Sequence, residues 1–166
     1  MKRRHLLMGG VAAAGLGACA PQTKFRTYNG PEVTYIVVNK EARSMYLLHQ
    51  DKVLKKYLID LGFAPIGDKF FEGDGRTPEG NYIIDRRNPN SQFHLSLGIS
   101  YPNARDRAEA AAIGTPPGGD IFIHGESNPF KRKRSDWTWG CIAVPNREME
   151  DDYAMVRNGT PIQINP

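Results

Sequence analysis

Short runs of alternating apolar and polar residues recur along most of the chain and predict a mainly β fold. These runs are rich in β-branched and aromatic residues, which favour the half-buried surface of a pleated strand. Two helices are also expected, one capped by Asn103 and running to Ile113, the other capped by Asn146 and running to Val156. The pattern indicates a single domain, a β-sandwich with two short helices at its rim. The expected strands cover residues 34–39, 45–49, 53–61, 81–85, 93–100, 121–124, 141–144 and 160–164.

The amino-terminal residues differ in character from the rest of the chain. Three basic residues at 2–4 precede an apolar stretch at 6–18 that is too short to span a bilayer and is typical of a secretory signal peptide. The stretch ends in LGAC, which resembles the lipobox of bacterial lipoproteins and implies that Cys19 becomes the lipidated first residue. The run RRHLL also resembles a twin-arginine signal, and a plain Sec signal or an uncleaved anchor is the alternative. We therefore expect a signal peptide at 1–18, a tether at 19–31, a folded domain at 32–166, and a periplasmic location with a membrane anchor through the lipid.

The net charge argues against a nucleic-acid partner. The formal charge of +4 includes the three basic residues at 2–4, so the rest of the chain carries only +1. The sequence pI of about 9.1 therefore overstates how basic the folded domain is. No surface-wide attraction to nucleic acid is expected.

The chain has two cysteines, and lipid on Cys19 would leave Cys141 as a free thiol in a compartment where disulfides form readily. A lone cysteine is ordinarily a small buried hydrophobic residue, so its neighbours must decide between packing and chemistry. His124 ends a predicted buried strand, and 16 residues separate it from Cys141. A loop of that length allows the two side chains to meet, as a nucleophile and its general base require. Gly140 permits a tight turn beside the sulfur, where backbone N–H groups could stabilise an oxyanion.

Two stretches resemble the catalytic motifs of the L,D-transpeptidase (YkuD-type) family. Residues 121–142 contain IFIHG and SDWTWGCI, similar to the family's H-G segment followed by [ST]-H-G-C. Residues 77–82, TPEGNY, resemble its T-P-x-G-x-[FY] element. The resemblance extends from about residue 33 to residue 164 and implies a β-sandwich of the L,D-transpeptidase type.

Position by position, the resemblance implies a role for each residue around the cysteine. Cys141 matches the nucleophile and His124 the base, and the carbonyl of Gly125 would hold the second imidazole nitrogen. Gly140 and the Cys141 N–H would belong to the oxyanion hole, and Thr138 occupies the [ST] position, where it would contact substrate. The implied substrates are peptidoglycan stem peptides, with an amine of a second stem peptide or of a wall-anchored protein as acceptor. The resemblance implies neither a metal nor an organic cofactor.

The sequence departs from the family pattern beside the nucleophile. Trp139 stands where the family has its second histidine, and Ala143 where it commonly has asparagine or arginine. The variant motif DWTWGC at 136–141 resembles a YafK-like subgroup in which some members cleave peptidoglycan links instead of joining them. Three functions stay open: a transpeptidase, a hydrolase or amidase of the same fold, and a wall-binding lipoprotein without catalysis. An activated cysteine is expected to have a lowered thiol pKa, which would argue against the third.

Other residues near the motifs have more than one interpretation. His94 is either a satisfied histidine of the sheet or a substrate-binding residue that lines the cleft opposite Cys141. Trp139, together with Trp137, is either rim packing or a platform for substrate. The basic run at 131–134 is either a solvated loop or an attraction for carboxylates of the cell wall. A zinc site is disfavoured, because the histidines and the cysteine show no paired ligand spacing.

Overall fold

The computed structural model describes residues 23–127 and 135–166. The predicted signal peptide, Cys19 and the basic run at 131–134 lie outside the described residues. The helices among the described residues are α1 (Ala104–Ala112) and α2 (Asn146–Met155). The strands are β1 (Tyr35–Asn39), β2 (Ser44–His49), β3 (Lys52–Leu58), β4 (Gly80–Asn88), β5 (Ser96–Ile99), β6 (Phe122–His124), β7 (Ile142–Ala143) and β8 (Pro161–Asn165).

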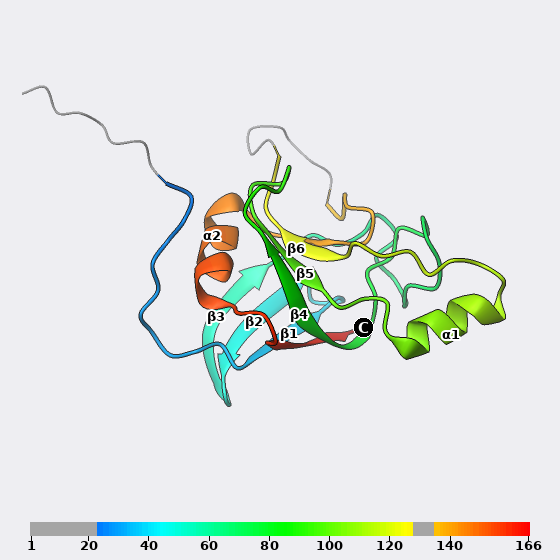
Figure 1. Ribbon diagram of the computed structural model, residues 1–166, viewed down its shortest axis with the longest axis horizontal. Coiled ribbons are helices and arrows are strands. Elements are labelled where there is room, and N and C mark those ends of the chain that lie inside the picture. The colour runs from blue at the N-terminus through cyan, green and yellow to red at the C-terminus, as the bar shows by residue number, and fades with distance from the viewer. Residues whose placement is uncertain (1–22, 128–134) are drawn as a thin grey trace, which may run out of the picture.

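These strands form one hydrogen-bonded sheet with the order β3-β2-β1-β8-β4-β5-β6-β7 (Figure 1). The sheet is curled, and its two edges meet where the chain after β3 forms an antiparallel bridge between Asp60 and Ala143 of β7. The Asp60 N–H donates to the Ala143 carbonyl at 2.9 Å, and the Ala143 N–H donates back at 2.8 Å. The predicted mainly β fold with two helices is confirmed.

Two of the predicted strands were too long, and each error has a local cause. The run at 53–61 belongs to β3 only as far as Leu58, because the chain then leaves β2 and bridges across the curl through Asp60 and Gly62. The run at 93–100 belongs to β5 only from Ser96, because His94 adopts a positive φ of 71° and turns the chain. Both deviations lie next to the segments that carry His124 and the cysteine.

The inner face of the curled sheet carries the hydrophobic core. β1 shows the expected alternation, in which Ile36 and Val38 are fully buried and their neighbours are half-buried. Close packing leaves little freedom to the strand ends that emerge from such a core. Other fully buried core residues are Met45, Leu47, Leu61, Ile84, Leu95, Leu97, Ile99, Ile123, Ile142 and Met149.

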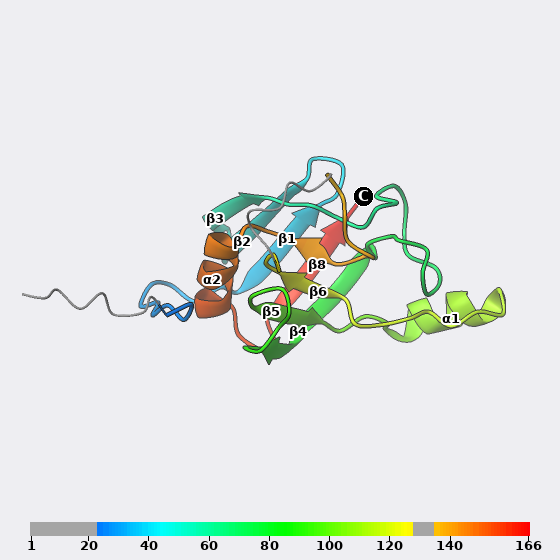
Figure 2. The same ribbon diagram turned by 90° about the horizontal axis from the view of Figure 1, so that it is seen from above.

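The two helices lie at opposite ends of the molecule (Figures 1 and 2). α1 projects from the sheet and begins with the predicted cap: the Asn103 side chain accepts from the N–H groups of Arg105 and Asp106, and the Asp106 carboxylate completes a capping box. The prediction that Asn146 caps α2 is wrong. Pro145 is the N-cap residue of α2, and no side chain caps the helix. Neither helix among the described residues has the length and apolarity needed to cross a membrane.

The part of the expected tether that the structure describes, residues 23–31, runs alongside α2 (Figure 1). Arg26 forms ion pairs with Glu150 and Asp151 of α2, with N–O distances of 2.7 and 2.6 Å. The Lys24 ammonium group donates to the carbonyl of His94 at 2.8 Å. This segment is therefore docked on the domain by charged contacts.

Helix α2 buries an acidic side chain beneath it. Asp152 is fully buried, and its carboxyl group lies beside the hydroxyl of Tyr57. Burial raises the pKa of Asp152 well above its ordinary value, and the negative charges of Glu148 and Asp151 raise it further. A hydrogen bond from Tyr57 and the positive charge of Lys55 oppose this rise without reversing it. The folded state therefore favours the protonated carboxyl group.

We expect Asp152→Asn to increase the free energy of unfolding at pH 7 and to change it little near pH 4. In the unfolded chain this carboxyl group loses its proton above about pH 3.9, whereas the folded state retains it. The stability of the wild-type protein therefore falls as the pH rises from that value toward the raised pKa of the folded state. The amide resembles the protonated acid and does not titrate, so the variant lacks this loss. Urea unfolding at both pH values measures the difference.

Asp151→Asn is the matched control. Burial opposes ionisation of Asp151, but hydrogen bonds and ion pairs with Lys55 and Arg26 outweigh it and lower the pKa. Its replacement should therefore reduce stability at pH 7, the opposite direction from Asp152→Asn. An Asp152→Asn effect that is the same at pH 4 and pH 7 would rule out the buried proton as its cause.

Candidate active site

Cys141 follows a tight turn whose hydrogen bonds come from Thr138. The Thr138 hydroxyl donates to the carbonyl of Cys141 at 2.7 Å and accepts from the N–H of Gly140 at 3.2 Å. The Thr138 backbone is also paired, because its N–H donates to the Leu61 carbonyl and its carbonyl accepts from Phe63. With only 3% of its surface exposed, Thr138 is not placed to contact substrate as predicted. Its place in the structure is to hold the turn that presents Cys141.

Gly140 is required by the backbone of this turn. Its φ is +122°, a backbone conformation that residues other than glycine rarely adopt. A Cβ atom at this position would lie 2.6 Å from the carbonyl oxygen of Arg76. Because the Gly140 N–H already donates to Thr138, the prediction that it contributes to an oxyanion hole is not supported by this geometry.

The loop that packs against this turn, residues 62–79, is held by buried charges. Thr77 is fully buried, and its hydroxyl accepts from the N–H of Gly62 at 3.1 Å. The Lys69 ammonium donates to Asp74 at 2.7 Å, and both side chains are almost fully buried. Asp68 accepts from the N–H of Glu79 at 2.7 Å. The TPEGNY element is therefore part of the loop that supports the turn before Cys141, with Gly62 and the Arg76 carbonyl lying next to that turn.

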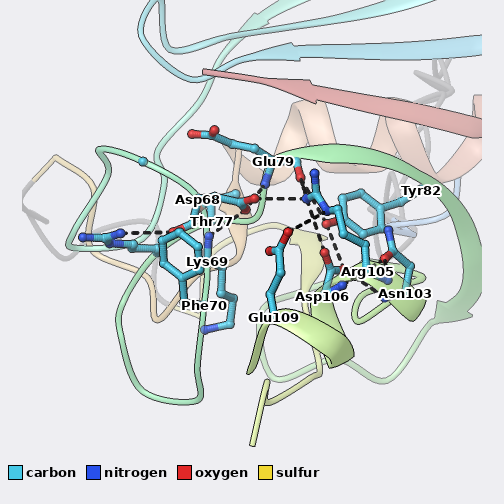
Figure 3. Close-up of polar contacts among 12 residues, drawn as sticks. Asp68, Lys69, Phe70, Thr77, Glu79, Tyr82, Asn103, Arg105, Asp106 and Glu109 are labelled. Atoms are coloured by element: carbon cyan, nitrogen blue, oxygen red, sulfur yellow. Dashed lines mark hydrogen bonds and ion pairs between the residues drawn. The ribbon is translucent and has the colours of Figure 1, made fainter. Parts of the chain in front are cut away.

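A second network joins this loop to α1. In Figure 3 the Arg105 guanidinium reaches Asp68 of the loop and Asp106 of its own helix, at 3.0 and 3.3 Å. The Tyr82 hydroxyl, at the end of the TPEGNY element, donates to Asp106 at 3.1 Å. The projecting helix is thus attached to the domain by charged and hydroxyl groups, while its apolar contact is small.

Asp136, the first residue of the DWTWGC motif, anchors the turn from the other side. Its carboxylate accepts from the guanidinium of Arg43, with Nη2–Oδ2 at 2.8 Å and Nε–Oδ1 at 3.0 Å. The same carboxylate accepts from the N–H of Leu61 at 3.0 Å. The motif by itself does not reveal this role of Asp136, because Arg43 lies 93 positions away in the chain.

His124 ends β6, where it is paired in register with Ala143 of the parallel strand β7. Its Nδ1 lies 2.7 Å from the carbonyl oxygen of Gly125, as the family resemblance predicted. A carbonyl oxygen can only accept, so Nδ1 carries the proton and the neutral ring has its lone pair on Nε2. The ring packs against both Phe93 and Trp137, with centroid distances of 4.5 and 5.6 Å. His124 is only 4% exposed, so its orientation is determined by packing as well as by hydrogen bonding.

Two cavities reach Cys141. The first has a volume of about 580 Å³ and is lined by both Cys141 and His124, with amide and hydroxyl side chains around them. The second, of about 430 Å³, shares Cys141 and Asp120 with the first. The first cavity is also lined by Asn88, Asn90, Ser91, Gln92, Phe93, Ser96 and Phe122, and the second by Lys69, Glu72, Gly73, Gly118, Gly119, Ile121 and Trp139.

The environment of Cys141 favours the neutral thiol. Burial raises the pKa of Cys141 above its ordinary value, and the carboxylate of Asp120 raises it further. A backbone hydrogen bond from Phe122 and the positive charges of Lys69 and Arg86 oppose this rise without reversing it. The thiol donates weakly to the carbonyl oxygen of Asp120 at 3.5 Å. The surroundings of Cys141 thus raise its pKa, the opposite direction from the lowered pKa expected of an activated cysteine.

Two other predicted substrate residues have different positions. His94 does not line either cavity; its Nε2 lies 2.9 Å from the carboxylate of Glu150 on α2. The satisfied structural histidine is therefore the interpretation that the geometry supports. Trp139 is 73% exposed at the rim of the second cavity, with its ring edge-on to Phe63 at 4.9 Å. Its position leaves an open aromatic surface beside Cys141.

Within residues 23–127 and 135–166, no group of three or more histidine, cysteine, aspartate or glutamate side chains is arranged to hold a metal ion.

A family comparison identifies the class of this site. The YkuD family, described as the L,D-transpeptidase catalytic domain, matches residues 33–164. The chain belongs to this L,D-transpeptidase family. The match includes the TPEGNY element, His124, Gly125 and the turn that carries Cys141.

Individual relatives agree with the family match. YafK of Escherichia coli strain K12 is 29% identical over 128 residues, covering 74% of this chain and 46% of YafK. YkuD of Bacillus licheniformis is 27% identical over 166 residues, covering 96% of this chain and 81% of that protein. Both carry the L,D-transpeptidase name. The helical cell shape determining protein Pgp2 from Campylobacter jejuni has the same fold, with a TM-score of 0.64 and 27% identity over 87% of this chain and 51% of Pgp2. The chain thus spans about half the length of YafK and Pgp2.

Proposed function

We propose that the protein is a peptidoglycan L,D-transpeptidase with Cys141 as nucleophile and His124 as base. The observation that carries this proposal is the 580 Å³ cavity that both side chains line. The imidazole is held there by the Gly125 carbonyl in the tautomer that a base requires. Membership of the L,D-transpeptidase family supports the reaction class.

The first half-reaction forms a thioester. Nε2 of His124 removes the thiol proton while Sγ of Cys141 attacks the carbonyl carbon of the diamino-acid residue in a stem tetrapeptide. Negative charge develops on the former carbonyl oxygen, for which the Cys141 N–H is the nearby backbone donor. The intermediate collapses by breaking the bond to the terminal D-alanine, and His124 returns its proton to the leaving amine.

The second half-reaction transfers the acyl group to an amine. A side-chain amine of another stem peptide, or of a wall-anchored protein, attacks the thioester carbon and forms an amide. His124 accepts the proton of the amine and returns it to the departing sulfur. The two cavities that share Cys141 support this scheme, because donor and acceptor can reach one sulfur through separate spaces.

The raised pKa of Cys141 bears on how the nucleophile is activated. A raised pKa favours the neutral thiol at rest, so the proton moves to His124 as the carbon–sulfur bond forms in the proposed reaction. The proposed mechanism is therefore general-base catalysis, in which His124 takes the thiol proton during the attack. Slow alkylation of the resting protein is compatible with an active enzyme, and alkylation rate does not separate an enzyme from a binding module here.

We also propose that the protein is exported and anchored in the membrane through lipid on Cys19, so that the domain meets peptidoglycan in the periplasm. The support is the amino-terminal sequence, with its basic start, apolar stretch and LGAC ending. The likeness to Pgp2, named as a helical cell shape determining protein, supports a role in shaping the cell wall.

Mass spectrometry of the purified protein incubated with a disaccharide-tetrapeptide tests the proposed reaction. We expect loss of D-alanine together with a cross-linked dimer, and a transient protein adduct with the mass of the acylated chain. Loss of D-alanine with only tripeptide would show transfer to water and make the protein a hydrolase on this substrate. Neither turnover nor an adduct would argue against both enzymes and for a wall-binding module.

A further inference from the structure

We propose that Asn146 is a positioning residue of this active site, which holds the Gly125–Glu126 peptide unit so that the unit's carbonyl oxygen fixes the proton of His124 on Nδ1. The inference deepens the proposed function and rests on it, because it assigns a residue to the base of that reaction. None of the sequence motifs points to this role, and Asn146 was expected only to cap a helix.

The geometry places one peptide unit between the two side chains. The carbonyl oxygen of Gly125 lies 2.7 Å from Nδ1 of His124. The N–H of Glu126 belongs to the same planar unit and donates to Oδ1 of Asn146 at 2.6 Å. In a trans peptide the C=O and N–H bonds point in opposite directions. By accepting from the Glu126 N–H, Asn146 fixes the orientation of the peptide plane. The Gly125 carbonyl on the opposite side of that plane is thereby directed at His124.

The close approach of Asn146 explains why a glycine precedes this peptide unit. A Cβ atom on Gly125 would lie 2.5 Å from Oδ1 of Asn146 and 3.1 Å from the carbonyl oxygen of Phe93. Gly125 is itself buried, and Asn146 is half-buried beside it. The absent side chain thus leaves the space that the asparagine oxygen occupies.

The position of Asn146 in α2 shows that its side chain is committed to this contact. Asparagine is a favoured cap residue, yet α2 begins after Pro145 without any side-chain cap, and Asn146 is the first residue inside the helix. Its oxygen accepts from the distant Glu126, 20 positions earlier in the chain. The first turn of α2 therefore has no side-chain cap, and the Asn146 side chain is hydrogen-bonded to the loop that follows β6 instead.

The chemical consequence concerns the tautomer of His124. With the proton on Nδ1, Nε2 can accept the proton of the Cys141 thiol; with the proton on Nε2, it cannot. If the peptide unit is free to rotate, the carbonyl no longer enforces the first tautomer. In a serine protease, loss of the group that orients the catalytic histidine lowers kcat by about 10⁴. Asn146 acts one step further away, so a smaller loss, about 10- to 100-fold in kcat, is expected.

Nitrogen-15 NMR of the histidine rings tests the inference independently of the reaction. At a pH where His124 is neutral, the wild-type ring should show its proton on Nδ1. Asn146→Ala should shift the signals toward a mixture of tautomers, and Asn146→Asp should restore the wild-type pattern, because a carboxylate oxygen accepts the same bond. Arg147→Ala, an exposed residue in the same helical turn, is the matched control and should leave the ring unchanged.

Kinetics provide the second readout. Asn146→Ala should lower kcat with little change in KM, and Asn146→Asp should recover most of the loss. An unchanged tautomer in a folded Asn146→Ala protein would overturn the inference whatever the activity. If Asn146→Ala does not fold, Asn146→Asp decides: a wild-type tautomer supports the inference, and an altered one overturns it. The NMR measurement needs no turnover. The tautomer of His124 can therefore be determined even if the proposed transpeptidase reaction is not observed.

Discussion

Replacement of Cys141 by alanine should reduce the release of D-alanine from a stem tetrapeptide to the level seen without protein. The proposed reaction forms a covalent bond to Sγ, and no other thiol of the described residues can replace it. Removal of a catalytic nucleophile in a comparable acyl-transfer enzyme lowers kcat by a factor on the order of 10⁶. Quantification of free D-alanine over hours, with the acyl adduct followed by mass spectrometry, measures the loss.

The alanine variant should fold normally. Cys141 is only partly buried, so loss of one sulfur atom removes little packing, and the thermal unfolding midpoint should change by only a few degrees. Cys141→Ser is a useful companion because it keeps a hydrogen-bond donor but offers a far weaker nucleophile. Turnover by a folded Cys141→Ala protein would refute the cysteine mechanism, and the hydrolase alternative that uses the same sulfur would fail with it.

Gly140→Ala is expected to have the largest effect on the structure of the site. The residue has a φ of +122°, which costs a residue with a Cβ atom about 1–3 kcal/mol. The new methyl group would also lie 2.6 Å from the carbonyl oxygen of Arg76, and relief of such a contact costs about another 1–3 kcal/mol. Urea unfolding should therefore show a loss of about 2–6 kcal/mol. Turnover should also fall sharply, because the turn that presents Cys141 must shift.

Gly159→Ala separates the two causes. Gly159 has a positive φ of +91°, but a Cβ atom there would meet nothing within 4 Å. This control should lose only about 1–2 kcal/mol and retain full activity, because it carries conformational strain without a steric contact. A Gly140→Ala protein as stable and as active as Gly159→Ala would show that the contact with the Arg76 carbonyl is not important.

Much of the local structure follows from short stretches of sequence. Residues 34–39 were predicted to form a strand from their β-branched and aromatic content, and β1 covers Tyr35–Asn39. Asn103 with Asp106 three positions later forms a capping box, a feature decided within one turn of chain. The histidine-glycine pair at 124 and 125 was similarly informative, since its hydrogen bond joins adjacent residues. In each case the interacting groups are near neighbours in the chain.

The errors share the opposite property. Asn146 was expected to cap its own helix, but its side chain is used by Glu126, 20 positions earlier. His94 was a candidate for the cleft, but it pairs with Glu150, 56 positions later. The strand predicted at 53–61 ended early because residues after Leu58 pair with the far edge of the curled sheet. A periodic pattern does not contain the partners that such contacts require.

By itself, the sequence determined the mainly β class, the positions of most strands, and the cysteine and histidine that the proposed mechanism uses. These depend on periodicity and on motifs a few residues long. The tertiary structure alone decided which groups surround those residues: that Thr138 holds the turn, that Asp136 pairs with Arg43, and that burial raises the pKa of the Cys141 thiol. The physical reason is that hydrogen-bond partners and desolvation come from segments that the curl of the sheet brings together, and their separation in the chain hides them from any local pattern.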